Sequence, residues 1–522
     1  MSSASDRNSR RSGNRRGRRP RQTAAPEAPS RSTRYRQLRH PFEPQRVFSD
    51  EAIQRIHDKA LQVLEQLGIK MLHPRARELF KAASASVDES TQMVRIGHDI
   101  IEAALGTAPS SFTLRAAAPE REQQYEPGSM LFTAGAGCPN AYDRERGRRP
   151  GSLRDFDETL QLQQSFDVIH LLGPSAEPQD VAPNLRHYEI TRSQLKYCDK
   201  PLFVYSRGAG QVQEAFDLIR LGLDLDDDTF ANGVWATTVI NTNSPRQLDI
   251  PMAEGIIEFA LAGQLSVITP FCLAGAMAPV SIAGALVLQH AEALTGIALA
   301  QLARPGAPVS YGGFASNVDM KSGSPAFGTP EHIKLSIGSG QLARLIGLPW
   351  RSAAGSASNT ADMQGGTENS MGLWAALQAN ATLTVHAAGW LEGGLSFGYE
   401  KFINDIEAVQ TLAELCEPLP DDDDTLAWSA LEDVDPGGHF FATDHTMQRY
   451  RDAFYSPLVA DLTNYGGWLE AGGLSATERA TGIWQRTLET FEAPAHAGDA
   501  LERMAPYIEA AQQRGGTPPA GG

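Results

Sequence analysis

Eight short apolar runs decide the fold: LFT at 131–133, VIHLL at 168–172, LFVY at 202–205, VWATTVI at 234–240, SVITPF at 266–271, VSY at 309–311, PWRSA at 349–353 and TLTVHA at 382–387. Successive runs begin 32 to 43 residues apart, which is the length of one strand followed by a crossover helix. Eight such units fill about 250 residues, the usual size of a TIM barrel. The spacing therefore favours an α/β fold with a (β/α)8 TIM barrel over 131–417. A doubly wound sheet stays open as an alternative, although it usually carries a Gly-rich phosphate turn after its first strand.

Helical patterns flank the predicted barrel on both sides. Residues 47–130 show helical spacing after Ser49 and Asp50, which predicts an N-terminal helical cap. Residues 418–522 open with an acidic loop and continue with helical patterns, which predicts a C-terminal helical extension packed on the barrel or on a neighbouring subunit. Together with the nearly all-apolar helix expected at 281–303, this extension indicates a homo-oligomer.

The first 46 residues are rich in arginine. They hold thirteen Arg against three acidic residues, a net +10, so the rest of the chain must carry −26 to give the total of −16. With almost no apolar residues, segment 1–46 is predicted to be a disordered tail. Such a tail is either a solvated extension or a contact for nucleic acid or an acidic partner. The acidic body without a signal peptide predicts a cytoplasmic protein.

The composition excludes several other classes. Hydrophobic residues make up 41% and charged residues 21%, as in an ordinary globular protein. Gln289, His290 and Glu292 interrupt the most apolar stretch, so no membrane span is expected. The four cysteines, at 138, 198, 272 and 416, form no C-x-x-C pair, which argues against a disulfide framework and against a cysteine-rich zinc site. We therefore predict no metal site.

The run Asp167 to Gly173 comes near the Asp-x-His-x-x-Gly signature of cobalamin-carrying domains. The spacing from Asp167 to His170 is one residue too long, and the run has the pattern of a barrel strand. We therefore interpret His170 as a core or rim histidine and expect no corrinoid bound through this motif. Single histidines such as His386 are likewise interpreted as structural.

The ends of barrel strands carry active sites, and here they are rich in aromatic residues. Aromatic rings around a cavity bind a quaternary ammonium by cation–π attraction, and an Arg fork suits a ligand carboxylate. Either Arg207 or Arg351 can serve that second role, unless it forms a surface ion pair. The predicted strand ends supply Tyr205, Arg207, Asn241, Phe271, Tyr311, Phe314, Trp350, Arg351, Ser356, Asn359, Trp390, Glu392, Phe397 and Tyr399.

From about residue 48 to 406 the sequence resembles the trimethylamine methyltransferase family, specifically its members without pyrrolysine. The resemblance is carried by FSDE at 48–51, VLEQLGI at 63–69, HPRAR at 73–77, APV at 278–280, AGAL at 283–286, AEALTG at 291–296, PGAPV at 305–309, AGS at 354–356 and NDI at 404–406. Ser356 stands at the position that holds pyrrolysine in the amine-specific members, in a loop two residues shorter. Glu392 lies in a further matching block.

The resemblance implies a TIM barrel that transfers a methyl group from an amine to the cobalt of a separate corrinoid protein. Without pyrrolysine, the implied substrate is a quaternary amine such as glycine betaine, whose permanent charge lets a neutral amine leave directly. The chain itself is then expected to hold no tightly bound cofactor. Tyr205, Phe271, Tyr311, Phe314, Trp350, Trp390, Phe397 and Tyr399 are the candidate ring residues, with Arg207 or Arg351 for a carboxylate. Ser356, which also reads as a space-filling residue, and Glu392 are the catalytic candidates.

Two alternatives from other classes remain open. The barrel can be a metal-dependent or acid–base enzyme if Glu392, His386 and Asp362 gather in one pocket. It can also be a non-catalytic betaine-binding protein, such as a sensor whose Arg-rich tail contacts nucleic acid.

Overall fold

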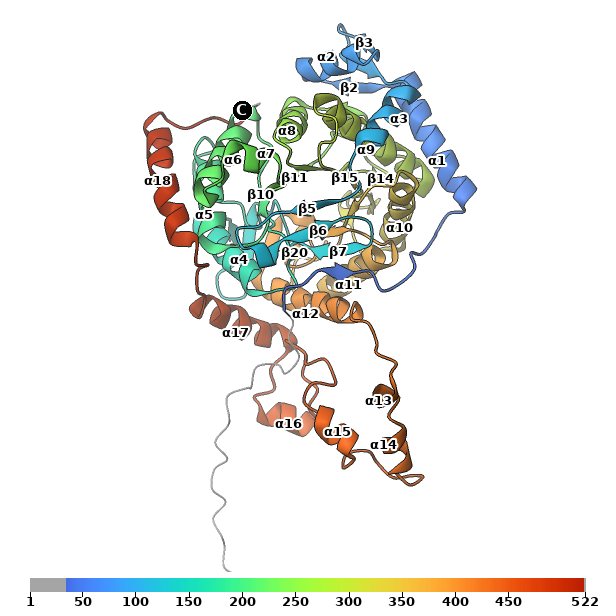
Figure 1. The fold of residues 1–522 in the computed structure, drawn as a ribbon, viewed down its shortest axis with the longest axis vertical. Helices are drawn as coiled ribbons and strands as arrows, with labels where there is room; N and C mark the ends of the chain where they lie inside the picture. Colours follow the sequence, from blue (N-terminus) through green and yellow to red (C-terminus); the bar gives the residue numbers. More distant parts are fainter. Residues whose placement is uncertain (1–33, 521–522) are drawn as a thin grey trace, which may run out of the picture. The chain divides into compact units, whose positions relative to one another are not determined.

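The computed structural model describes residues 34–520, and these divide into two compact units. The larger unit comprises 34–425 and 457–520 and holds every described strand (Figure 1). The smaller unit, described over 426–456, contains the short helices α14 (Trp428–Glu432) and α15 (Asp444–Arg449), and α13 (Asp423–Leu426) leads into it. Most of the predicted Arg-rich tail, residues 1–33, lies outside the described residues.

A curled, mostly parallel sheet forms the centre of the larger unit. Seven strands run parallel, and β1 (Leu38–Arg39) adds an antiparallel edge beside β7. From that edge the order is β7 (Ser129–Phe132), β19 (Leu383–Val385), β18 (Trp350–Ala353), β15 (Val309–Gly312), β13 (Leu265–Ile268), β11 (Ala236–Ile240) and β10 (Leu202–Phe203). Seven of the eight predicted runs are therefore strands of one sheet, and the α/β class is confirmed.

The remaining predicted run, 168–172, which is the second in sequence order, is not a regular strand. Leu171 forms one parallel bridge with Thr133, beyond β7, and the Leu172 N–H donates to the Pro201 oxygen, just before β10, at 3.2 Å. The His170 ring explains why no longer ladder forms, because its Nδ1 accepts the Phe132 N–H, a donor on the adjacent strand, at 3.2 Å. His170 is buried, as expected for a core histidine.

Helices follow the strands in sequence and form the outer layer (Figure 1). Several begin after a capping residue whose side chain accepts a backbone N–H of the first turn. These capping residues are Ser152, Asp249, Ser281, Thr329 and Asp362. The outer helices are α4 (Leu153–Ser165), α5 (Arg186–Tyr197), α6 (Ala209–Leu223), α7 (Asp227–Ala231), α8 (Ile250–Leu261), α9 (Ile282–Ala303), α10 (Pro330–Leu345), α11 (Met363–Gln378) and α12 (Tyr399–Leu415).

Helix α9 is the most apolar of these helices. Among the described residues it is the one helix long and apolar enough to span a membrane, and 78% of its most apolar window is buried inside the protein. Helices α1 (Asp50–Gln62), α3 (His98–Thr107), α8 and α10 pack against it. Most of its apolar surface is therefore covered within this chain. The homo-oligomer itself stays a prediction.

The N-terminal region, predicted as a helical cap over 47–130, is a mixture of helices and strands. After α1 come a π-helical turn (Val63–Leu67), α2 (Pro74–Ala82) and α3. Three strands between these helices join a fourth from the βα loop after β11. This sheet consists of β12 (Gln247–Leu248), β2 (Ile69–Met71), β4 (Met93–Arg95) and β3 (Ser86–Asp88).

A hairpin of β5 (Phe112–Leu114) and β6 (Gln123–Tyr125) closes the end of the sheet where its strands begin. Leu114 bridges to Val234, just before β11, and the Tyr125 hydroxyl donates to Ser310 Oγ at 2.8 Å. Both hairpin residues are fully buried and pack in one cluster with inward-facing residues of the central strands, Leu131, Leu265, Val267, Leu383 and Val385. The hairpin therefore forms an apolar floor for the sheet.

Residues 34–46 do not follow the prediction of a disordered tail over 1–46. The Tyr35 hydroxyl lies 2.8 Å from both the Arg121 and the His170 carbonyl oxygens, and Leu38 is buried in β1. One tyrosine and one leucine thus provide an aromatic and an apolar anchor within a strongly basic segment, and β1 completes the edge of the sheet.

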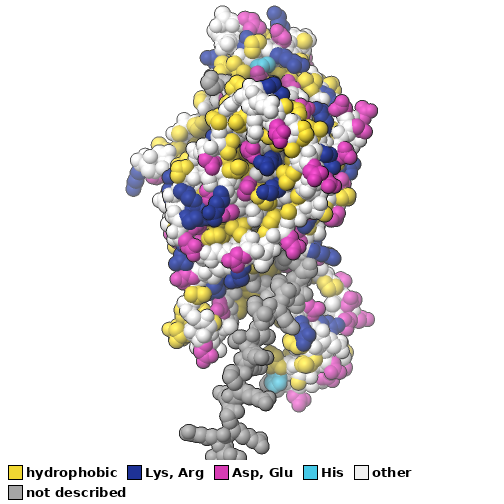
Figure 2. All heavy atoms as spheres, turned by 90° about the vertical axis from the view of Figure 1, so that its left-hand side faces the viewer, with side chains coloured by type: hydrophobic (Ala, Val, Ile, Leu, Met, Phe, Trp, Pro, Cys, Tyr) yellow, Lys and Arg dark blue, Asp and Glu magenta, His cyan; other side chains and the backbone are white. Residues whose placement is uncertain are grey.

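The C-terminal region packs two helices on the outside of the larger unit. Helix α17 (Ala476–Glu489) contacts α12 and α4, and α18 (Ala497–Gln513) contacts α5 and α6, after the short α16 (Tyr465–Glu470). The helical patterns predicted within 418–522 thus include these two helices, which the loop that contains Pro494 separates. Figure 2 shows side chains of both charge signs interspersed with apolar ones over one face.

Short strands within the βα loops cover the opposite end of the sheet from the floor. They form a four-stranded sheet of β20 (Trp390–Leu391), β21 (Ser396–Gly398), β8 (Asn140–Asp143) and β9 (Gly147–Pro150). A second group consists of β14 (Leu273–Ala274), β16 (Ser316–Val318) and β17 (Pro325–Ala326). These loops surround the entrance to the cavity described next.

Candidate functional site

A cavity of about 440 Å³ lies at the carboxyl ends of the central strands. Every strand of the parallel sheet, or the loop that follows it, contributes to its lining. The walls are largely apolar, with few polar groups, which is typical of small-molecule sites. The residues used below are Thr133, Ala136, Phe203, Tyr205, Arg207, Asn241, Phe271, Phe314, Arg351, His386 and Trp390.

Four rings form one connected wall of this cavity. Phe314 lies between Phe271, with ring centroids 4.8 Å apart, and Trp390, at 5.7 Å. His386 stacks on Trp390 with centroids 4.2 Å apart and 12° between the ring planes. Tyr205 contributes a further ring from the loop after β10. Such a wall offers π-faces to a bound cation.

Two glycines create the slot that holds the indole of Trp390. Gly355 and Gly394 both have a φ of 105°, which favours glycine. A Cβ atom on Gly355 would lie 2.2 Å from the Trp390 ring, and one on Gly394 would lie 2.4 Å from it. The position of Trp390 therefore depends on the absence of a side chain at these two residues.

Arg351 projects into the cavity from β18 and is fully buried. Its guanidinium carbon lies 4.8 Å from the centre of the Phe314 ring, and its Nη2 lies 3.3 Å from His386 Nε2. Its Nε and Nη1 have no hydrogen-bond partner among residues 34–520. Burial lowers the pKa of Arg351 to about 9. A buried cation with unused donors is well suited to bind an anion.

Arg207 also lines the cavity, but its charge is already paired. It lies 2.7 Å from Glu177 Oε1, which Arg186 contacts at 2.6 Å, and its guanidinium carbon lies 4.3 Å from the Tyr205 ring centre. Of the two arginines that the sequence left open, Arg351 is therefore the one available to a ligand carboxylate.

Two predicted ring residues, Tyr311 and Trp350, face away from the cavity. They are direct partners in the register between β15 and β18, and Gly312 and Arg351 form the next pair. Because side chains alternate along a strand, Arg351 and Trp350 must face opposite sides of the sheet. Tyr311 instead contacts Gln289 and His290 of α9, and the Trp350 indole donates to the Asn380 oxygen at 2.9 Å.

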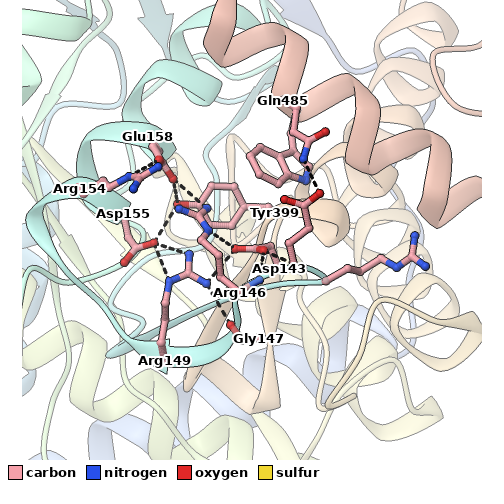
Figure 3. A network of polar contacts seen from close by, with 12 residues as sticks. Asp143, Arg146, Gly147, Arg149, Arg154, Asp155, Glu158, Tyr399 and Gln485 are labelled. Atoms are coloured by element: carbon pink, nitrogen blue, oxygen red, sulfur yellow. Dashed lines mark hydrogen bonds and ion pairs between the residues drawn. The ribbon is translucent and has the colours of Figure 1, made fainter.

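Phe397 and Tyr399 lie outside the cavity lining as well. Phe397 packs against Phe402, with ring centroids 5.7 Å apart, in a buried cluster. The Tyr399 hydroxyl donates to Glu158 at 2.7 Å, and Arg146 covers its ring at 4.9 Å (Figure 3). Tyr399 thus belongs to a network of ion pairs outside the cavity.

The two predicted catalytic residues have partners of their own beside the cavity. Ser356 is buried, and its hydroxyl donates to Glu368 at 2.6 Å. The Glu392 carboxylate accepts hydrogen bonds from Arg148 at 3.0 Å and from Ser396 at 2.8 Å. Neither side chain lines the cavity, although Gly393 and Gly394, directly after Glu392, do. The space-filling reading of Ser356 agrees with this placement.

The acid–base alternative required Glu392, His386 and Asp362 to gather in one pocket. Of the three, only His386 lines the cavity, whereas Asp362 caps α11 by accepting the Gly365 N–H. No group of three or more His, Cys, Asp or Glu side chains within residues 34–520 is arranged to hold a metal ion.

Sequence reasoning missed several lining residues, His386 above all. It directly follows Val385, the last residue of β19, and the carboxyl ends of parallel strands are where sites form. This position is the signal that could have identified it. Burial, and secondarily the charge of Arg351, hold the pKa of His386 well below its usual value. Three further lining residues received no site role from the sequence, although each lies at or just after a strand end: Thr133, Phe203 and Asn241.

The chain is similar to known methyltransferases. A trimethylamine methyltransferase (MTTB) family model matches residues 11–516. A glycine betaine methyltransferase of Desulfitobacterium hafniense (strain Y51) is 33% identical over 451 residues, which cover 86% of this chain and 93% of that protein. The trimethylamine methyltransferase MttB of Desulfitobacterium hafniense (strain DSM 10664 / DCB-2) is 28% identical, over 83% of this chain and 87% of that protein. The trimethylamine methyltransferase MttB of Methanosarcina thermophila is also 28% identical, over 82% of this chain and 89% of that protein. The chain therefore belongs to the trimethylamine methyltransferase family.

Proposed function

We propose that this protein transfers a methyl group from a quaternary amine of the glycine betaine type to the cobalt of a separate corrinoid protein. The observation that carries the proposal is the cavity, which combines a wall of aromatic rings with the guanidinium of Arg351, whose Nε and Nη1 have no hydrogen-bond partner among residues 34–520. Membership of the family and the likeness to a glycine betaine methyltransferase support it.

The chain's own contribution is to bind, orient and desolvate the amine. The rings of Phe271, Phe314 and Trp390 hold the fixed positive charge by cation–π attraction. With the apolar walls they also exclude water, which strengthens the attraction and holds one methyl group toward the entrance. The partner's reduced corrinoid supplies the nucleophilic cobalt that accepts the methyl, while the C–N electron pair stays on nitrogen and a neutral amine leaves. We assign no corrinoid ligand to this chain.

The same proposal includes a closed TIM barrel. Segment 168–172 contacts β7 through the bridge between Leu171 and Thr133, and it contacts the start of β10 through the hydrogen bond from Leu172 to Pro201. Leu171 and Leu172 also line the cavity, between residues from β7 and β10. On this proposal, segment 168–172 takes the place of the eighth strand and completes the wall.

We further propose that the protein works in the cytoplasm. The four cysteines are all free, and three of them, Cys138, Cys198 and Cys272, are buried. Reduced thiols are typical of that compartment. The corrinoid partner would then approach the entrance formed by the βα loops, where the strands end.

Methyl transfer to reduced cobalamin, followed by its absorption spectrum, tests the proposed activity. The panel contains glycine betaine, carnitine, proline betaine, choline and trimethylamine. We expect turnover with at least one of the quaternary amines and none with trimethylamine. If no amine is demethylated while the cobalamin stays reduced, but one still binds in a calorimetric titration, the non-catalytic betaine-binding protein replaces the enzyme.

A further inference from the structure

Residues 426–456, the described part of the smaller unit, leave most of their apolar side chains exposed. Within this range only Ala430 and Thr443 are buried. Trp428 is 68% exposed and Phe441 is 79% exposed. So many exposed apolar side chains in one short segment are typical of a surface that binds another polypeptide. They are Leu426, Trp428, Leu431, Phe440, Phe441, Met447, Tyr450 and Phe454.

The segment 421–456, which contains these side chains, is also strongly acidic. Its nine acidic residues outnumber Arg449 and Arg451, which gives a net charge of −7. Residues 1–33 carry nine Arg against two acidic residues, a net charge of +7. The two segments therefore have charges of equal magnitude and opposite sign. An arginine can satisfy both features of the acidic segment, because its planar fork pairs with carboxylates and stacks on aromatic faces.

The described chain begins close to the residues that lead into the acidic segment. Arg36 Nε lies 2.7 Å from Glu417 Oε1, and Arg36 Nη2 lies 3.4 Å from Glu414 Oε1. Residue 33 is three positions before Arg36, and residue 421 is four positions after Glu417. The basic and the acidic segment thus start from one set of ion pairs. Such a short tether raises the effective concentration of one segment near the other to roughly the millimolar range.

We propose that segment 1–33 binds along the acidic and aromatic segment 421–456 of the same chain. Its guanidinium groups pair with the carboxylates and cover the exposed rings, so that the N-terminal segment contributes the packing that residues 426–456 lack among themselves. This contact is separate from the cavity and from the proposed methyl transfer. It identifies the acidic partner of the arginine-rich segment as a part of the protein itself, in place of nucleic acid.

Hydrogen exchange of the full-length protein, followed by mass spectrometry, tests the contact. Helices α14 and α15 have only five and six residues, so neither is stable by itself. Their amides should be protected only while segment 1–33 is bound. We expect protection over 426–456 at about 50 mM salt and a loss of roughly tenfold or more at about 500 mM, because salt screens these charges. A fourfold variant should show the same loss at low salt: Arg15→Ser, Arg16→Ser, Arg18→Ser and Arg19→Ser.

A pair of matched variants separates specific pairing from a general change in charge. Four neutralised carboxylates in the acidic segment should speed exchange over 426–456: Asp421→Asn, Asp423→Asn, Asp433→Asn and Asp435→Asn. Removal of like charges alone would stabilise that segment and slow its exchange, so the sign of the change is decisive. Four exposed carboxylates of the larger unit provide the control and should leave 426–456 unchanged: Glu65→Gln, Glu102→Gln, Asp227→Asn and Asp228→Asn. The buried helix α9 should stay protected in every variant, which shows that the fold persists.

Three results overturn the proposal. The first is equal exchange over 426–456 in the unaltered protein and in the arginine variant. The second is protection that disappears on tenfold dilution, which assigns the bound segment to a second copy of the chain. The third is binding of duplex DNA at the lower salt concentration while 426–456 exchanges freely, which assigns the arginines to nucleic acid.

Discussion

Trp390 stacks on His386 with ring centroids 4.2 Å apart, so one aromatic pair supports both the ring wall and the contact with Arg351. The first prediction concerns the indole. Trp390→Ala should weaken glycine betaine binding roughly 30-fold, because a desolvated cation–π contact contributes about 2 kcal/mol. Trp390→Phe keeps a π-face and should lose less. Calorimetry gives both Kd values, and Trp374→Ala, at a half-exposed tryptophan on α11, is the control. Unchanged binding by Trp390→Ala would remove this ring from the site.

A single methyl group should displace the same indole. Gly355→Ala places a Cβ 2.2 Å from the Trp390 ring and requires a φ of 105°, so the ring or the loop must move. We expect glycine betaine affinity to fall at least several-fold. Gly366→Ala is the control, since its Cβ would meet nothing within 4 Å and alanine favours the helix. If both variants bind alike, the glycine slot does not position Trp390.

The affinity for glycine betaine should depend on pH in the alkaline range. Burial lowers the pKa of Arg351 to about 9 in the free protein, so the guanidinium loses its proton, and with it the carboxylate contact, above that pH. The affinity should be constant from pH 7 to 8 and should fall above pH 9, by up to tenfold per unit. The ligand itself does not titrate in this range.

The other titratable lining residues do not produce this decline. Burial raises the pKa of Tyr205, and burial together with the charge of Arg351 lowers that of His386. Burial by itself would lower the pKa of Arg207, but the contacts of this residue with Glu177 and Tyr205 outweigh burial and raise that pKa. Choline binding provides the check in the same titration, because it should stay level through pH 9. A parallel decline for choline would point to unfolding instead of Arg351.

A buried ion pair behind the site should be important for stability. Lys401 donates to both carboxylate oxygens of Asp405, which also accepts the Gly389 N–H at 2.9 Å, next to Trp390. Asp405→Asn leaves the lysine charge buried without a partner and should cost about 3 to 5 kcal/mol of unfolding free energy. Denaturant unfolding measures the loss. Asp50→Asn, which breaks the exposed pair with Arg46, should cost less than about 1 kcal/mol. Similar losses in both variants would contradict the assignment.

The course of the chain was largely predictable, because strand spacing depends on local pattern. Seven of the eight apolar runs became strands of one sheet, and the family resemblance was confirmed. Segment 168–172 did not form the predicted strand because the His170 side chain accepts a hydrogen bond from the Phe132 N–H. The periodicity of the sequence does not reveal this tertiary contact. Tyr35 and Leu38 were missed for a related reason, since two isolated anchors in a basic segment give no pattern.

Half of the twelve predicted site residues line the cavity: Tyr205, Arg207, Phe271, Phe314, Arg351 and Trp390. The prediction that Trp350 lines the cavity could have been avoided. Consecutive residues of a strand face opposite sides of the sheet, so Trp350 and Arg351 could not both point into the cavity. The pairing of Arg207 with Glu177 and the covering of Tyr399 by Arg146 could not be foreseen. Both depend on which distant side chains meet in three dimensions.

The floor made by the β5–β6 hairpin has a kinetic consequence. Leu114 and Tyr125 fill the end of the sheet where the strands begin, so the proposed substrate and acceptor protein would both reach the cavity from the end formed by the βα loops. On the proposed function, a docked acceptor protein would cover that entrance, so the amine would have to bind before the acceptor and the product amine would leave after it. An ordered binding sequence would follow, and a large excess of the proposed acceptor should then slow turnover by covering the entrance.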